Sequence, residues 1–227
     1  MNNIDKTKTL GQLVARYPYT VDVLNKYKID YAFKGDVPLE KAIKKRGLTE
    51  YDVIGELELS VDEFKMMNDK EVMYWDNEPI GKILDFIEEK HHRFVLKTLK
   101  QTDFLLSKIE ITGDLLISLT GLFRKLKEDM ESHQAKEEEN LFPLLRQYEN
   151  NRAEELRNTI VRYMNETENE HDVAGDLFQK INDLTNDYTI PVGSSEDYKK
   201  VIQLLDALEK DTFKHIHLEN SILFKMI

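Results

Sequence analysis

The sequence contains no cysteine, which excludes a disulfide framework and a thiolate metal site. It has no run of about 18 apolar residues, the length that spans a membrane as a helix. Its first ten residues, MNNIDKTKTL, lack the apolar core of an export signal. From these absences we expect a cytoplasmic protein with no membrane partner.

Basic residues are outnumbered: 32 Lys and Arg stand against 43 Asp and Glu, giving a net charge of −11. Nucleic acids and anionic membranes attract basic surfaces, so neither is expected as the main partner.

Glycine and proline are also scarce, with 9 and 5 occurrences in 227 residues. Long stretches have apolar residues at helical spacing, which predicts an all-α protein. The predicted long helices cover 79–108, 113–148, 152–184 and 195–226, and short turn-like sequences join them. This pattern favours an up-down four-helix bundle. The predicted domains are a small helical N-terminal domain at 1–64, a linker at 65–78 and the bundle at 79–227.

Two of the predicted helices carry a histidine and a glutamate on an otherwise apolar stripe. The pattern H-x3-E-x3-L-F occurs at His133 and Glu137 and again at His215 and Glu219. Residues four apart differ by only about 40° around a helix, so both members of each pair face the core.

The other two helices each offer an inward imidazole. The third helix places His171 on its apolar stripe. The first helix has adjacent His91 and His92, and periodicity alone leaves the choice between them open. His217 lies about 200° around the helix from His215 and is expected to be exposed.

These residues together predict a metal site. An ionised carboxylate in a dry core is costly unless it is paired or binds a metal. Imidazoles and carboxylates without thiolates suit iron, with manganese as the other candidate. Six ligands suit two ions: Glu137 and Glu219 would bridge both, beside an oxo or hydroxo bridge, and each ion would take two histidines. The adjacent Glu138 and Glu139 are expected to form a solvated acidic face.

The motifs SHQAKEEENLFP, ENEHDVAGDLF and KHIHLENSILF resemble those of a known family. They are similar to the three downstream metal motifs of the iron–sulfur cluster repair di-iron proteins (RIC, repair of iron centres), which have a hemerythrin-like bundle. PIGKILDFIEEKHHRF resembles the segment where that family has a Tyr-His pair, with His91 in the tyrosine position. The resemblance therefore implies His92 as the ligand. It implies the following ligand set: His92, His133, Glu137, His171, His215 and Glu219. It also places Glu170 in a supporting shell or on an iron exit route.

The N-terminal part resembles the short helical domain of the same family, with one departure. Where the family has Asp-Tyr-Cys-Cys-Gly-Gly, this chain has Asp30-Tyr31-Ala32-Phe33-Lys34-Gly35. Both thiols are absent, which argues against a thiol role for this domain. A docking surface at Phe33 and a role in packing alone are the two interpretations that remain.

The resemblance implies a function in repairing iron–sulfur clusters damaged by nitrosative or oxidative stress. It implies iron donation and reaction of the diferrous site with nitric oxide. The implied partners are damaged iron–sulfur proteins or cluster-assembly proteins, with NO or O2 as small ligands; a homodimer is compatible with the sequence. An enzymatic turnover is not assigned, because metal transfer does not require one. The alternatives are a hemerythrin-like O2 or NO carrier or sensor, and a metal-free helical scaffold.

Overall fold

The computed structural model describes residues 4–67, 75, 78–110 and 113–227, and within these ranges it contains helices and turns but no strand. The chain divides into two compact units, Met1–Pro79 together with Ile216–Ile227, and Ile80–His215. The predicted boundaries at 64 and 79 stay predictions, and most of the predicted linker 65–78 lies outside the described residues.

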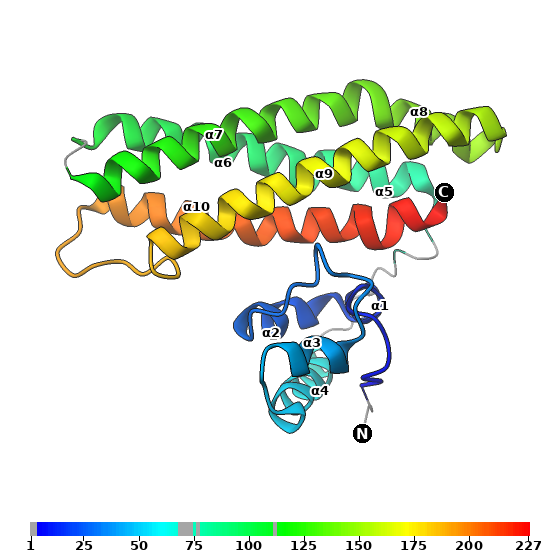
Figure 1. Cartoon of the computed structure of the whole chain (residues 1–227), viewed down its shortest axis with the longest axis horizontal. Coiled ribbons are helices and arrows are strands. Elements are labelled where there is room, and N and C mark those ends of the chain that lie inside the picture. The colour runs from blue at the N-terminus through cyan, green and yellow to red at the C-terminus, as the bar shows by residue number, and fades with distance from the viewer. Residues whose placement is uncertain (1–3, 68–74, 76–77, 111–112) are drawn as a thin grey trace. The chain divides into compact units, whose positions relative to one another are not determined.

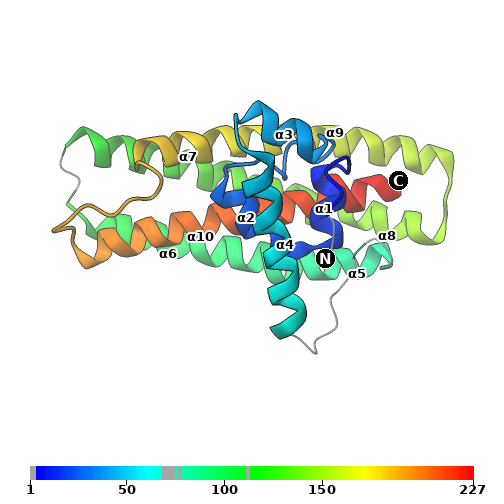
Figure 2. The same cartoon turned by 90° about the horizontal axis from the view of Figure 1, so that it is seen from below.

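Four long helical segments form the bundle, as the sequence predicted. The first consists of α5 (Ile80–Phe86), a π-helix η3 (Ile87–His92) and α6 (Arg93–Lys108). The second consists of α7 (Asp114–Lys136), a π-helix η4 (Glu137–Leu141) and α8 (Phe142–Asn150). The third is α9 (Glu154–Leu184), and the fourth runs through α10 (Glu196–Leu218), a π-helix η5 (Glu219–Leu223) and a 3-10 turn η6 (Phe224–Met226). These segments lie side by side in both views (Figures 1 and 2), which confirms the all-α bundle.

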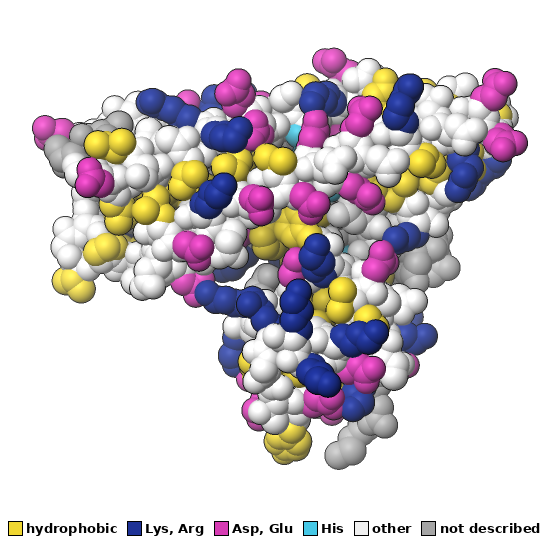
Figure 3. All heavy atoms as spheres, in the orientation of Figure 1, with side chains coloured by type: hydrophobic (Ala, Val, Ile, Leu, Met, Phe, Trp, Pro, Cys, Tyr) yellow, Lys and Arg dark blue, Asp and Glu magenta, His cyan; other side chains and the backbone are white. Residues whose placement is uncertain are grey.

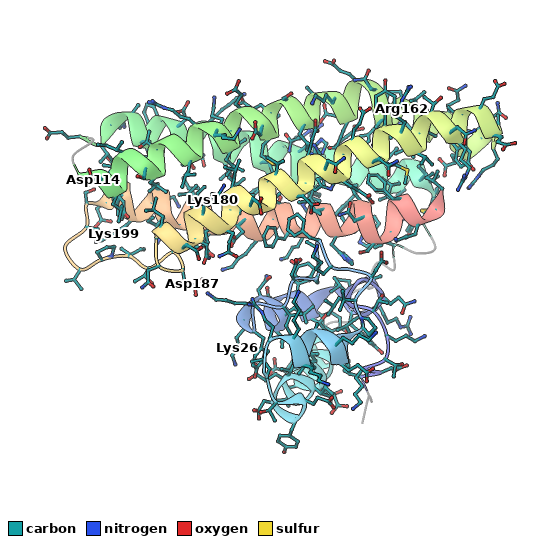
Figure 4. All side chains as sticks on the ribbon, in the orientation of Figure 1. Lys26, Asp114, Arg162, Lys180, Asp187 and Lys199 are labelled. Atoms are coloured by element: carbon teal, nitrogen blue, oxygen red, sulfur yellow. The ribbon has the colours of Figure 1, made fainter. Side chains whose placement is uncertain are left out.

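The direction of each helix decides which residues meet at one level of the bundle. Asp114 at the start of α7 and Lys199 near the start of α10 lie at the same end (Figure 4). Lys180 of α9 lies closer to that end than Arg162, which precedes it on the same helix. Helices α7 and α10 therefore run in one direction, and α9 runs in the other, as α6 does (Figure 1).

The bundle core follows from the helical spacing of apolar residues. Leu99 of α6, Phe123 of α7, Phe178 of α9 and Leu205 of α10 are completely buried in one apolar cluster. Gly113, with φ 81°, supplies the left-handed conformation directly before α7 begins, which favours glycine there. On the visible face of the bundle, acidic and basic side chains are interspersed (Figure 3).

The N-terminal residues form short helices, namely α1 (Leu10–Arg16), η1 (Pro18–Thr20), α2 (Val21–Lys26) and α3 (Leu39–Lys45), followed by the longer α4 (Glu50–Met67). Thr9 and Gln12 form a capping box that fixes the start of α1. In segment 30–35, the Phe33 N–H donates to Asp30 Oδ1 at 2.9 Å. Ala32 is buried and Phe33 is half-buried, so this turn is part of the packed unit.

Candidate metal centre

All six histidines of the chain are buried, the most accessible being His91 at 7%. Histidine is usually intermediate in burial, so six buried imidazoles in one helical protein require a common explanation. Glu137 and Glu219 are equally buried, at 1% and 0%.

Three of the four long helical segments switch to π-helix beside candidate ligands. The first π-helix ends at His92, and the other two begin at Glu137 and Glu219. A π segment inserts extra backbone into a helix and often marks a functional site, because it re-aims the adjacent side chains. Periodicity arguments assume an α-helix and did not predict these segments. The glutamate of the repeated H-x3-E-x3-L-F pattern coincides with the start of both later π-helices.

The structure brings all six predicted ligands together in two groups of four. His92 and His215 form one group with Glu137 and Glu219, and His133 and His171 form the other with the same two glutamates. Within each group, one ligand atom from every residue lies within 4.8 Å of the others. Two groups that share both carboxylates have the arrangement predicted for two bridged ions; that they bind metal stays a prediction.

Glu137 lies at the centre of this arrangement. Its Oε2 is 3.4 Å from His92 Nε2, 3.3 Å from His133 Nε2 and 3.9 Å from His215 Nε2. Among the described residues, neither of its carboxylate oxygens has a hydrogen-bond partner. A buried carboxylate surrounded by imidazole nitrogens rather than by hydrogen-bond donors fits a cation, and the donor set fits iron or manganese.

Two carboxylates outside the two groups contact the Nδ1 atoms of two candidate ligand histidines. Glu138 Oε1 lies 2.6 Å from His92 Nδ1, and Glu170 Oε2 lies 2.9 Å from His133 Nδ1. A proton that each Nδ1 donates to its carboxylate leaves Nε2 as the metal-binding lone pair. Glu138 is exposed, as predicted for a solvated acidic face, with a side-chain exposure of 45%. The sequence did not predict that its carboxylate also reaches back to the ligand ring.

Glu170 contacts the candidate ligand His133, and the supporting role that the family resemblance implied for it stays a prediction. The hydrogen bond with His133 and an ion pair with Lys136 lower its pKa to about 2, despite partial burial. Glu170 is therefore ionised at neutral pH and is a permanent acceptor for the His133 ring.

His91 is inward as well, although neither group contains it. Its Nδ1 lies 3.1 Å from Asp211 Oδ2, and its ring stacks on that of His215 with centroids 5.9 Å apart and planes 11° from parallel. Two adjacent residues can both face inward here because they close a π-helix, where the α-helical spacing does not hold. This is the physical reason that periodicity could not choose between His91 and His92.

The prediction that His217 is exposed was wrong. It is 3% exposed and contacts the ring of Tyr31, which belongs to the same compact unit, edge-on with centroids 5.9 Å apart. The angle around the helix correctly separates His217 from the ligand face, but helical angle cannot show that a second surface covers it. Burial lowers the pKa of His217 to about 4, so its ring is neutral at physiological pH.

Comparison with known proteins finds a matching family for each of the two parts of the chain, and relatives that span nearly all of it. Residues 83–227 match the hemerythrin HHE cation binding domain, and residues 6–60 match ScdA_N, a domain of unknown function (DUF542). The iron-sulfur cluster repair protein ScdA of Staphylococcus haemolyticus is 25% identical over 226 residues, covering 97% of this chain and 98% of the relative. The iron-sulfur cluster repair protein YtfE of Escherichia coli O81 is 30% identical over 223 residues, covering 96% of both.

None of the helices in the described part of the chain has the length and apolar character needed to span a membrane. A bundle with buried His and Glu groups, matched by the cation-binding domain over most of its length, identifies the family. This chain belongs to the hemerythrin-like iron–sulfur cluster repair proteins.

Proposed function

We propose that this chain is a cytoplasmic di-iron protein that helps repair iron–sulfur clusters damaged by nitrosative or oxidative stress. The observation that carries the proposal is the pair of buried four-residue groups that share Glu137 and Glu219. The relatives are named iron–sulfur cluster repair proteins, and this name suggests the process.

In this proposal each ion takes two histidines of its own and both shared glutamates. His92 and His215 hold one ion, and His133 and His171 hold the other. The donor set of imidazoles and carboxylates suits iron and also accepts manganese. Iron at this centre supplies the capacity to change oxidation state and to bind small ligands such as NO or O2.

The residues around the centre orient its ligands. Glu138 and Glu170 each hold a proton on the Nδ1 of a ligand histidine and so direct its Nε2 inward. Buried apolar side chains on the same helices limit the access of water.

Glu170 also offers a route for iron donation. Glu170 has a side-chain exposure of 32% and contacts His133, so it joins the second group to solvent. A carboxylate at that place can accept an ion as it leaves its ligands, and damaged iron–sulfur proteins or cluster-assembly proteins are the proposed recipients.

The test begins with protein purified without oxygen. Iron per chain and the absorption spectrum are measured, and the loaded protein is then mixed with a [4Fe–4S] dehydratase that NO has inactivated. About two irons per chain, and recovery of dehydratase activity with loss of iron from this protein, are the expected results. Iron that stays bound while O2 or NO binds reversibly would favour a carrier or sensor and would contradict repair by donation.

A further inference from the structure

One buried layer next to the four ligand histidines is apolar except at a single position. Helices α6 and α9 run opposite to α7 and α10 (Figure 1). By helix geometry, residues three after a histidine on the first pair therefore lie at about the same level as residues three before a histidine on the second pair. This rule selects Val95, Met130, Ala174 and Thr212, which are exposed by only 0%, 2%, 4% and 0%. The first three belong to the same apolar cluster.

This layer lies on the side of the histidines that the carboxylates do not occupy. Glu137 and Glu219 each follow their histidine by four residues, at the start of η4 and η5, which continue α7 and α10. Met130 and Thr212 precede those histidines by three. The carboxylates and the layer therefore bracket the histidines from opposite directions along the bundle. A small ligand that reaches the centre from the side of this layer would not meet Glu137 or Glu219.

Thr212 is the exception in this layer. Its hydroxyl is fully buried, and it has no hydrogen-bond partner among the residues that the structure describes. A buried hydroxyl without a partner costs free energy, and a threonine inside a helix commonly satisfies its hydroxyl on the carbonyl one turn earlier. The Thr212 hydroxyl does not make this bond to the carbonyl. Thr212 lies one turn from His215 on the same helix face.

We infer that the Thr212 hydroxyl is the hydrogen-bond partner of a small exogenous ligand bound at the metal centre. The inference rests on the proposed metal site and names the residue that recognises its ligand. A hydroxyl can donate to a lone pair of a diatomic or triatomic ligand. Val95, Met130 and Ala174 offer no other polar contact, so this side of the centre selects small, weakly polar or singly charged ligands over multiply charged ones.

The inference is tested with azide as the probe on the oxidised, iron-loaded full chain. Azide affinity is measured by absorption titration for the wild type and for Thr212→Val, which removes the hydroxyl and keeps the shape. Loss of one hydrogen bond is expected to weaken azide binding about fivefold. Thr212→Ser, which keeps the hydroxyl, is expected to stay within about twofold of the wild type.

Two further variants separate this effect from a general disturbance of the core. Thr102 is also fully buried with a hydroxyl that has no partner among the described residues, but it lies about 15 Å beyond His92 along its helix. Thr102→Val is expected to leave azide affinity unchanged. Gln134 follows His133 and is buried with an amide that likewise lacks a partner in the described chain. Weaker azide binding in Gln134→Leu, without a change in Thr212→Val, would assign the contact to the amide and overturn the inference.

Iron per chain is measured for every variant before azide is added. A wild type that takes up no iron would overturn the proposed function itself, a result distinct from a loaded Thr212→Val with unchanged affinity, which would overturn only the role of Thr212. The infrared azide band of the wild type supplies a second readout. It is expected to shift between H2O and D2O, and the shift is expected to be absent in Thr212→Val; equal shifts in both proteins would contradict the inference.

Discussion

His92 Nε2 lies 3.3 Å from His215 Nε2, although the two histidines are 123 positions apart in the chain. Glu138 accepts a hydrogen bond at Nδ1 of His92, which leaves its Nε2 as a lone pair that points toward a second imidazole nitrogen. A cation that accepts both nitrogens satisfies this geometry, and Glu137 Oε2 lies within 4 Å of each of them. This geometry therefore predicts that the group binds a metal ion.

The shared carboxylates are expected to be the least replaceable ligands. Glu137→Gln keeps the shape of the side chain but removes its charge from both groups at once, so most of the iron should be lost. Glu139→Gln, in the same π-helix but exposed, removes the same charge and should retain the iron. Iron analysis of the two purified proteins compares them directly. Equal iron in both variants would exclude Glu137 as a bridging ligand.

The adjacent histidines of the first helix should differ in the same assay. His92→Phe is expected to lose iron, because His92 belongs to a ligand group. His91→Phe is expected to retain it, because an aromatic ring there can still stack on His215. The opposite result, with iron lost only when His91 is replaced, would reverse the assignment between the two residues.

The fold was largely predictable because its determinants are periodic. The four long helices follow from apolar spacing, and the scarcity of proline and glycine left few places for them to end. The inward faces of His133, Glu137, His215 and Glu219 follow from the same spacing, since residues four apart share a face. Patterns on one helix suffice for these features.

The features that the sequence did not predict depend on what covers each helix and on departures from α-helical geometry. The burial of His217 depends on Tyr31, which lies 186 positions earlier in the numbering, and no pattern within the last helix encodes it. The contact of Glu138 with His92 pairs residues from different helices. The inward position of His91 depends on a π-helix, whose extra residue violates the periodicity that the prediction used.

Removing metal should destabilise the protein. Without a cation, Glu137 and Glu219 are two carboxylates close together in a dry core, which disfavours folding. Binding at a free-iron concentration of 100 times the dissociation constant adds about 2.7 kcal/mol to the free energy of unfolding. Thermal unfolding of loaded and chelator-treated protein should therefore differ by several degrees. Identical melting temperatures would contradict a metal site in the core.

Replacing each of two helical glycines by alanine should change the free energy of unfolding in opposite directions. A Cβ on Gly11 of α1 would lie 2.9 Å from Ser221 Cβ and 3.1 Å from the Gly35 carbonyl oxygen, and these residues belong to one compact unit. Gly11→Ala should therefore destabilise the protein by about 1–3 kcal/mol. Gly121 of α7 has nothing within 4 Å of its added Cβ, so Gly121→Ala should stabilise it by about 0.5–1 kcal/mol.

Urea unfolding of both variants measures these changes. The double variant Gly11→Ala with Ser221→Gly should recover part of the loss, because the second change removes the crowded Cβ. A Gly11→Ala protein as stable as Gly121→Ala would show that α1 does not approach Ser221 closely in solution.

Glu209 of α10 should make stability depend on pH near neutrality. Burial raises its pKa to about 7, and the charges of Asp206 and of Asp187, which is labelled in Figure 4, act in the same direction. Between the ordinary value of 4.5 and about 7, the folded chain holds a proton that the unfolded chain has lost. The free energy of unfolding therefore falls as the pH rises through this window.

Glu209→Gln removes this dependence, because glutamine resembles the protonated acid at every pH. Urea unfolding from pH 5 to pH 8 should show the variant close to the wild type at the acidic end and more stable than the wild type at the alkaline end. Glu196→Gln, on the same helix with a side-chain exposure of 88%, should follow the wild type throughout. If the Glu209→Gln and wild-type curves were parallel over the whole range, the carboxylate would have to be ionised in the folded protein, and its burial in solution would be less complete than the structure shows.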